Sequence, residues 1–198
     1  MEWWLIRHGL TIWNVEHRYQ GHSDIKLLEG EKHGLGALQQ KLKGVSFAAI
    51  YCSDLLRCRQ TLEYVRPELS VGAVHIDGGL CEMDFGEVRF DSRLREMNFG
   101  EWEGKTYDML KDIPLYRSWI DQPQLYAPPG GESWEQFQGR VHEFFCELSA
   151  TSPNADEPML IVTHGGVISM LSTFLNPGLH FWEAARAAPG EVLKVQIN

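Results

Sequence analysis

Apolar and polar residues alternate along this chain in short blocks. Four apolar runs, each bounded by polar or turn residues, lie at residues 3–6, 47–52, 159–162 and 192–197. Runs of this length with turn signals at both ends are typical of buried β-strands. The pattern therefore predicts four strands in the core of a sheet.

Helical patterns occupy the stretches between these runs. Apolar residues recur every three or four positions over residues 55–65, 137–148 and 167–175. Residues 133–136 (SWEQ) form a capping box that predicts the start of the second of these helices. Strands that alternate with helices of this length pair in parallel through crossover connections. We therefore expect an α/β fold of three layers, a mostly parallel sheet with helices on both faces.

The length of 198 residues is near the upper end of one ordinary domain, so we expect a single domain over residues 1–198. Residues 80–131 interrupt the alternation and end in an aromatic- and proline-rich part with weak periodicity, which predicts a lid-like excursion over the sheet edge. Within it, residues 80–87 (LCEMDFGE) are echoed by residues 94–101 (LREMNFGE). Two copies are too few for a solenoid, so we interpret them as a local tandem duplication.

Composition and charge exclude several classes of protein. The formal net charge of -9 argues against general affinity for nucleic acid or for an anionic membrane, because both need a basic face. The first apolar run is too short for a signal peptide, and no later stretch has the length of a membrane span. Cytoplasmic residence is the expectation that remains. The cysteines lack C-x-x-C or zinc spacing and are interpreted as reduced, mostly buried thiols: Cys52, Cys58, Cys81 and Cys146.

Two polar clusters that contain histidine follow directly on apolar runs. Arg7 and His8 follow the first run, and His164 follows the third. Because ligands bind at the carboxyl ends of parallel strands, both clusters are expected at one edge of the sheet. A lone histidine at a strand end is more often structural than catalytic. Three further features favour a functional site: the second histidine cluster, Arg57 in the first turn of a helix, and Glu96 in a glycine-rich loop.

These residue types suit the transfer of a phosphoryl group. A phosphomonoester is a dianion, and the planar forks of Arg7 and Arg57 can each bind two of its oxygens. The first turn of a helix adds backbone N–H groups and the positive end of the helix dipole. His8 can attack phosphorus as neutral imidazole when its other nitrogen is held by a hydrogen bond, for which a backbone carbonyl near Gly9 is a candidate.

Two further residues complete the expected chemistry. Glu96, kept protonated beside the incoming dianion, can protonate the leaving alkoxide and later deprotonate the attacking water. His164 would be a second cationic or hydrogen-bonding group that stabilises the transferring phosphoryl. Metal binding by His8 and His164 is the rival interpretation, but partners at the spacings H-x-H or H-E-x-x-H are missing. No metal and no other cofactor is expected.

Four segments carry a resemblance to a known family. Residues 7–14 (RHGLTIWN) resemble the R-H-G-x-T-x-x-N signature of the histidine phosphatase (phosphoglycerate mutase-like) superfamily. Residues 53–61 (SDLLRCRQT) are similar to its second-arginine motif, residues 94–104 (LREMNFGEWEG) to its L-x-E-x-x-F-G-x-W-E-G loop, and residues 163–166 (THGG) to its closing histidine motif. Four ordered motifs across nearly the whole chain make the match specific.

The resemblance implies a phosphoglycerate mutase-like fold and a role for each matching residue. It makes His8 the nucleophile that forms phosphohistidine and Glu96 the proton donor. Arg7, Arg57 and His164 would form the phosphate pocket. Asn14 would line it, and Thr11, Gly21 and Gly165 are the further candidates for substrate binding. Glu82, in the first copy of the duplication, is the alternative proton donor, and Glu96 is preferred because only its copy continues into residues 102–104 (WEG).

The short chain and residues 128–133 (PPGGES) make the sequence more similar to the phosphatase branch, notably to α-ribazole phosphatases of cobalamin synthesis. The expected function is hydrolysis of a small phosphorylated metabolite, with α-ribazole 5'-phosphate as the favoured substrate. A phosphoglycerate mutase and a catalytically silent phospho-ligand-binding module are the alternatives. Leu10 and the stretch 24–34 depart from the family pattern. A homodimer is a further expectation.

Overall fold

The computed structural model describes residues 1–71, 88–150, 157–184 and 187–197. The first copy of the duplication, with Glu82, lies outside the described residues, as does Cys81. The strands are β1 (Glu2–Arg7), β2 (Ala49–Cys52), β3 (Val88–Phe90), β4 (Met159–Thr163) and β5 (Val192–Gln196). The α-helices are α1 (Ile12–Val15), α2 (Gly36–Leu42), α3 (Leu56–Val65), α4 (Tyr107–Leu110), α5 (Pro114–Asp121), α6 (Trp134–Ala150) and α7 (Gly165–Leu175). Short 3-10 turns are Gly30–His33, Pro67–Val71, Ser92–Leu94 and Gly100–Trp102.

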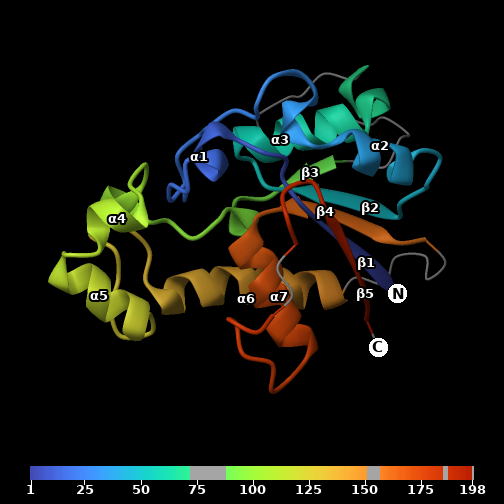
Figure 1. Cartoon of the computed structure of the whole chain (residues 1–198). Helices are drawn as coiled ribbons and strands as arrows, with labels where there is room; N and C mark the ends of the chain where they lie inside the picture. Colours follow the sequence, from blue (N-terminus) through green and yellow to red (C-terminus); the bar gives the residue numbers. More distant parts are fainter. Residues whose placement is uncertain (72–87, 151–156, 185–186, 198) are drawn as a thin grey trace.

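The sheet has the strand order β3-β2-β4-β1-β5 (Figure 1). The pairs β1 with β4, β2 with β4 and β2 with β3 are parallel, and β5 runs antiparallel to β1 at the edge. The four predicted strands and the mostly parallel sheet are confirmed. Strand β3 was not predicted, because its three residues are half-buried or exposed and form no apolar run.

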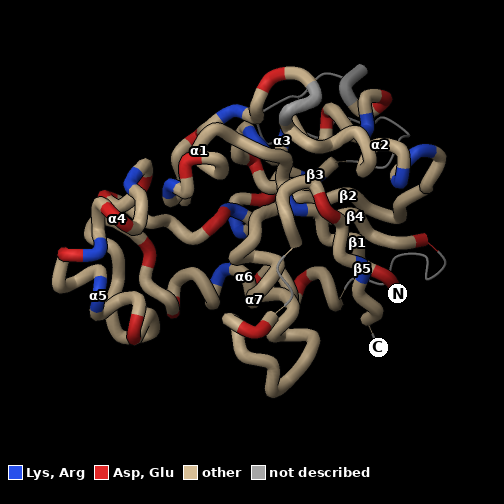
Figure 2. Tube along the Cα trace, viewed as in Figure 1, with Lys and Arg blue, Asp and Glu red and all other residues tan. Residues whose placement is uncertain are grey.

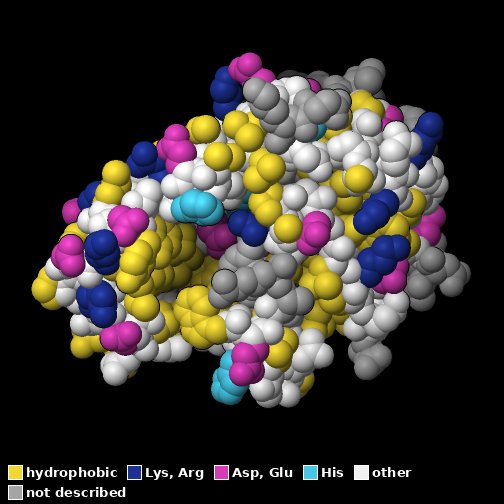
Figure 3. Space-filling view, viewed as in Figure 1, with side chains coloured by type: hydrophobic (Ala, Val, Ile, Leu, Met, Phe, Trp, Pro, Cys, Tyr) yellow, Lys and Arg dark blue, Asp and Glu magenta, His cyan; other side chains and the backbone are white. Residues whose placement is uncertain are grey.

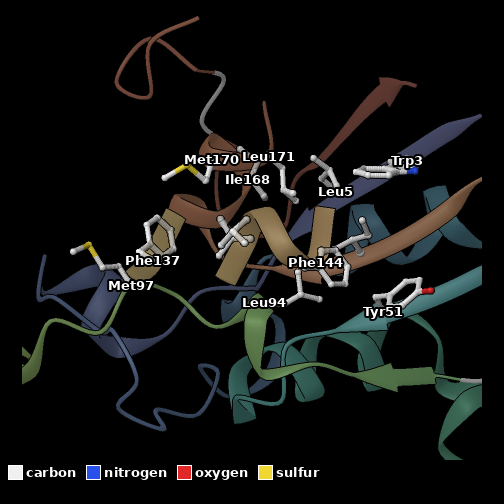
Figure 4. Close-up of a cluster of buried hydrophobic side chains, with 14 of the residues drawn as sticks. Trp3, Leu5, Tyr51, Leu94, Met97, Phe137, Phe144, Ile168, Met170 and Leu171 are labelled. Atoms are coloured by element: carbon white, nitrogen blue, oxygen red, sulfur yellow. The ribbon is translucent and has the colours of Figure 1, made fainter. Parts of the chain in front are cut away.

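Strand side chains alternate between two cores, which explains the three layers. Trp3 and Leu5 pack with α6 and α7 on one face, whereas Trp4 and Ile6 pack with α2 and α3 on the other. Figure 4 shows the first of these cores, with Phe144 among the side chains between the sheet and the helices. Helices therefore cover both faces, as the sequence predicted (Figure 1).

The three predicted helices are α3, α6 and α7. The expected capping box begins α6, because the Gln136 backbone N–H donates to Ser133 Oγ at 3.2 Å and the Ser133 N–H donates to Gln136 Oε1 at 2.8 Å. Two of the predicted buried thiols, Cys52 and Cys58, are buried and free, and the thiol of Cys146 is free but exposed.

The described part of the expected excursion carries short helices and an aromatic core of its own. Helices α4 and α5 project to one side of the sheet, on the left in Figure 1. Trp102, Tyr116 and Trp119 are buried there, with the Trp102 and Tyr116 rings 5.1 Å apart between centroids. The hydroxyls of Tyr19 and Tyr116 are 2.8 Å apart, which ties this segment to the loop after α1. Its aromatic residues therefore pack a small core despite the weak helical period.

Charged residues are mixed over the molecule. Figure 2 shows Lys and Arg interspersed with Asp and Glu along the trace, and no basic face is seen in this view. Among the described residues, no helix combines the length and the apolar character needed to cross a membrane. No group of three or more potential metal-ligating side chains occurs within the same described ranges.

Strand β4 is the middle strand of the sheet and belongs to its core, because all five of its residues are buried. Replacement of the fully buried Ile161 by alanine should lower the free energy of unfolding by about 2–5 kcal/mol, from lost burial and the cavity left behind. Urea unfolding followed by circular dichroism measures this change. Leu125→Ala is the control, since Leu125 is 74% exposed and should change stability by less than about 0.5 kcal/mol. Equal effects of the two substitutions would contradict the assignment.

Candidate active site

Strand register brings the two histidine clusters together. Arg7 on β1 pairs with Thr163 on β4, so His8 and His164 are the next residues at neighbouring strand ends. The His8 backbone N–H donates to the Thr163 carbonyl at 3.0 Å. The two imidazole rings meet edge to face with centroids 5.2 Å apart. The expected site at the carboxyl edge of the sheet thus has a defined geometry.

His8 has one imidazole nitrogen held by the backbone. Its Nδ1 lies 2.7 Å from the Gly9 carbonyl oxygen, so Nδ1 carries the hydrogen and donates it. The lone pair is then on Nε2. Burial lowers the pKa of His8 well below its usual value, and the positive charges of Arg57 and Arg7 lower it further, while the bond to Gly9 opposes them. His8 is therefore a neutral imidazole with a free Nε2 lone pair.

Arg57 is fully buried in the first turn of α3 and is held by a loop. Its Nη1 donates to the Ser23 carbonyl at 2.8 Å and its Nη2 to the Gly21 carbonyl at 2.7 Å. Gly21 has φ of +51°, and a Cβ there would lie 1.9 Å from Glu103 Oε1. Gly21, expected as a substrate-binding residue, thus orients Arg57 through its carbonyl. Only glycine fits this tight turn without strain.

Arg7 lies at the end of β1 and contacts the loop before β5. Its Nη1 donates to the Ala187 carbonyl at 3.1 Å, and its guanidinium packs against the backbone of Gly165, where a Cβ would come within 3.4 Å. Both arginines and His8 line a small pocket of about 150 Å³, called the inner pocket below. Its lining is completed by Asn14, Arg18, Tyr19, Gln20, Glu96 and Phe99.

Thr11 and Asn14 shape the turn after β1. Thr11 is fully buried and is the N-cap residue of α1, and its backbone N–H donates to Asn14 Oδ1 at 3.0 Å. Asn14 lines the inner pocket, as the resemblance implied, while Thr11 supports the loop. Arg18 and Gln20 also line the pocket and were missed, because no periodic pattern or charge cluster distinguishes them in the sequence.

Glu96 reaches the inner pocket from the loop after β3. Its Oε2 accepts a hydrogen bond from the Gly166 backbone N–H at 3.0 Å, and its Oε1 accepts one from the Met97 N–H at 3.1 Å. A Cβ on residue 166 would lie 2.3 Å from Glu96 Oε1. The glycine at the start of α7 therefore makes the space that the carboxyl group occupies.

Arg140 on α6 holds the backbone of the Glu96 loop. Its Nη1 donates to the carbonyls of Arg93 and Arg95, each at 2.7 Å, and its Nη2 donates to the Glu96 carbonyl at 2.9 Å. The same guanidinium forms a two-point ion pair with Glu132, at 2.7 and 2.9 Å. No sequence pattern predicts these contacts, because Arg140 lies on the polar side of an amphipathic helix. Arg140 thus holds in place a segment that forms neither strand nor helix at residue 96.

His22 lies beside this loop, and its backbone N–H donates to Glu103 Oε1 at 2.8 Å. Burial lowers the pKa of His22, and nearby Arg140 lowers it further while Glu132 opposes this.

His164 is fully buried beside His8. Its Nε2 lies 2.9 Å from Ser53 Oγ and 3.4 Å from Cys58 Sγ. Burial lowers the pKa of His164 well below its usual value, and Arg57 and His8 add to the effect. It is therefore neutral in the free site, so of the two expected roles the structure supports hydrogen bonding over a positive charge.

The protonation of the two active-site histidines can be measured directly. At pH 6.5, where an ordinary imidazole is half protonated, His8 and His164 should both stay neutral because protonation would place a charge in a buried site beside arginine. The ¹⁵N chemical shifts of the rings report this, with assignments from His8→Gln and His164→Gln. For His8, the proton is expected on Nδ1. A doubly protonated His8 ring at pH 6.5 would contradict the geometry.

Arg140→Lys tests whether the hydrogen bonds of Arg140 position Glu96. Lysine keeps the charge but lacks the fork that spans three carbonyls and a carboxylate, so the turnover of alkyl phosphates should fall about tenfold to a hundredfold. The loss should be smaller for 4-nitrophenyl phosphate, whose leaving group needs no proton. Steady-state kinetics of both substrates measure the difference. Arg117→Lys, at an exposed site on α5, is the control, and an equal loss on both substrates would mean that these hydrogen bonds are merely structural.

Comparisons with known proteins agree with this site. The family model of the histidine phosphatase superfamily (branch 1) matches residues 3–89 and 87–198. The adenosylcobalamin/alpha-ribazole phosphatase of Escherichia coli (strain K12) is 31% identical over 173 residues, which cover 86% of this chain and 77% of that protein. A probable phosphoglycerate mutase of Salmonella choleraesuis is 32% identical over 187 residues, covering 92% of this chain and 78% of its own length.

Among solved structures, the alpha-ribazole phosphatase from Shigella flexneri superposes with a TM-score of 0.82. It is 30% identical in sequence, and the match covers 100% of this chain and 91% of that one. Three observations indicate the same family: the residues at the carboxyl edge of the sheet, the family match along the chain, and this structural similarity. The chain belongs to branch 1 of the histidine phosphatase superfamily.

Proposed function

We propose that this chain is a metal-independent phosphomonoesterase that acts through a phosphohistidine at His8 Nε2, with α-ribazole 5'-phosphate as its substrate. The observation that carries the proposal is the hydrogen bond between His8 Nδ1 and the Gly9 carbonyl. It leaves Nε2 as a nucleophile in a pocket that Arg7, Arg57 and Glu96 also line.

In the first step, the Nε2 lone pair of His8 attacks phosphorus and the P–O bond to the alkoxide breaks. The inner pocket has room for a phosphoryl group, and the guanidinium groups of Arg7 and Arg57 stabilise the charge on its oxygens. Glu96, in its acid form, gives its proton to the leaving oxygen. The product alcohol departs and the phosphoryl group stays on His8.

In the second step, the Glu96 carboxylate removes a proton from a water molecule. The oxygen of that water attacks phosphorus, the P–N bond breaks, and the electron pair returns to His8 Nε2. The backbone N–H groups of Gly166 and Met97 hold the carboxylate in place for both steps. Inorganic phosphate then leaves and the neutral imidazole is restored.

The choice of substrate rests on the relatives. Adenosylcobalamin/alpha-ribazole phosphatases of Escherichia coli and Salmonella typhimurium are 31% and 34% identical to this chain. The similarity to a probable phosphoglycerate mutase keeps that activity as the rival enzymatic outcome. Intact His8, Arg7, Arg57, Glu96 and His164 support an active enzyme over a silent binding module.

Phosphate release in the presence of EDTA tests mechanism and substrate together. The panel contains α-ribazole 5'-phosphate, phosphoglycerates, ribose 5-phosphate and 4-nitrophenyl phosphate. We expect the wild type to release phosphate fastest from α-ribazole 5'-phosphate, with no loss in EDTA. His8→Ala should lower the rate at least about a thousandfold, because the nucleophile is removed. His142→Ala, an exposed histidine on α6, is the matched control.

Three outcomes would contradict the proposal. Loss of activity in EDTA would mean that a metal ion takes part. Isomerisation of phosphoglycerates without phosphate release would identify a mutase. Equal rates for wild type and His8→Ala would show that His8 is not the nucleophile. The proposal also predicts an acid-labile phosphoryl group on the wild-type protein after rapid quenching, and in that case this group would be missing.

A further inference from the structure

The carbonyl group that holds His8 in place belongs to a glycine. Gly9 has no side chain that could anchor its backbone, and glycine has the widest choice of backbone conformations. The hydrogen bond from His8 Nδ1 nevertheless needs the Gly9 carbonyl to point at the imidazole ring, at 2.7 Å. Contacts with neighbouring segments must therefore fix the direction of this carbonyl.

The N–H groups on either side of Gly9 bind to backbone, whereas that of Gly9 itself binds to a side chain. The His8 N–H and the Leu10 N–H each donate to a backbone carbonyl at 3.0 Å. The Gly9 N–H donates to Thr61 Oγ1 at 3.0 Å, and this hydrogen bond is buried. Of these three consecutive contacts, the one with Thr61 is thus the one that a side-chain substitution can remove without changing the loop itself.

The Thr61 hydroxyl has a defined direction. Thr61 is fully buried on α3, one turn after Arg57. Its hydroxyl hydrogen is donated to the Arg57 carbonyl oxygen at 2.6 Å, so a lone pair of Oγ1 remains for the Gly9 N–H. A single hydroxyl therefore connects the helix that carries Arg57 to the loop that carries His8.

Thr61 lies outside the space that a substrate can reach. Figure 3 shows the molecule hollowed between the projecting α4–α5 part and the body, and a cavity of about 660 Å³ lies beside the inner pocket. The two spaces share Arg7, Tyr19, Glu96 and Phe99 as lining residues, and Thr61 lines neither of them. Its hydroxyl can therefore influence the reaction through neighbouring residues, but not by contact with the ester.

The direction of the Gly9 carbonyl decides which nitrogen of His8 is free to react. The hydrogen of a neutral imidazole can lie on either ring nitrogen, and the bond to Gly9 places it on Nδ1. If the carbonyl turned away, part of the protein would carry the hydrogen on Nε2, and those molecules could not attack phosphorus. An anchored Gly9 thus sets both the direction of the ring and the fraction of protein that is ready to react.

We propose that Thr61 is a positioning residue for the nucleophile, whose hydroxyl holds the Gly9 backbone so that the Gly9 carbonyl keeps the hydrogen of His8 on Nδ1. This inference rests on the proposed function and deepens it, because it names a residue outside the pocket that keeps His8 ready to attack.

The first experiment observes the His8 ring without any substrate. Thr61→Val replaces the hydroxyl by a methyl group of similar size and leaves the Gly9 N–H without an acceptor. The ¹⁵N chemical shifts of the wild-type ring should report hydrogen on Nδ1, whereas Thr61→Val should show a second population with hydrogen on Nε2. Thr61→Ser, which keeps the hydroxyl, should restore the wild-type spectrum.

The matched control is Thr173→Val. The Thr173 hydroxyl also donates to a carbonyl of its own helix, that of Met170 on α7, at 2.7 Å. Its loss should leave the His8 ring as in the wild type. Circular dichroism checks that each variant is folded, and Thr61→Ala takes the place of Thr61→Val if the latter does not fold.

The second experiment measures the reaction itself. In Thr61→Val, kcat/KM should fall about tenfold for an alkyl phosphate and for 4-nitrophenyl phosphate alike, because every leaving group needs the nucleophile. Most of the loss should be recovered in Thr61→Ser. The inhibition constant of inorganic phosphate should stay within about twofold of the wild-type value, because Arg7 and Arg57 keep their side-chain contacts.

The outcomes separate this inference from the proposed chemistry. If the wild type hydrolyses no ester while the His8 ring changes in Thr61→Val as expected, the proposed function is overturned and the positioning role stands. If the wild type releases phosphate, an unchanged His8 ring or an unchanged kcat/KM in Thr61→Val overturns the positioning role and leaves the phosphatase standing. A rise of about tenfold in the inhibition constant of phosphate, with an unchanged His8 ring, would assign the effect to Arg57 and would also overturn the positioning role.

Discussion

The parallel pairing of β1 with β4 is the constraint on which the rest of the site depends. Side chains alternate along both strands into two cores, so a slip of one residue would turn every buried side chain to the wrong face. The register is therefore fixed by burial of the strand side chains in the two cores, and not by the active-site residues themselves. Since His8 and His164 directly follow the paired residues, the same burial sets the distance between the two imidazoles.

Burial also decides the electrostatics of the inner pocket. Two guanidinium groups beside a histidine disfavour its protonated form, and the low exposure of His8 acts in the same direction. Burial and the arginines that would bind the anion in the proposed mechanism thus keep the proposed nucleophile neutral. Arg57 is held by loop carbonyls and Arg7 by the Ala187 carbonyl, so their positions are set before a ligand arrives.

The sequence predicted those parts of the structure that follow from periodicity or from a motif. Alternation of apolar runs and helical patterns predicted the sheet and its covering helices, and the motifs predicted which residues would meet at its edge. Arg140 could not be found in this way, because its role depends on three carbonyls contributed by an irregular loop. The cavity of about 660 Å³ beside the inner pocket could not be predicted for a similar reason, because its walls join side chains that are far apart in the sequence, among them Tyr19, Phe99, Trp119 and Trp182.

The absence of a side chain at Gly166 links the fold of α7 to Glu96, the acid of the proposed mechanism. A single methyl group at that position would push the Glu96 carboxyl away from the helix terminus while leaving His8 and both arginines untouched. Under the proposed mechanism, such a protein would keep the groups that bind the phosphate and would lose the one that protonates the leaving alcohol.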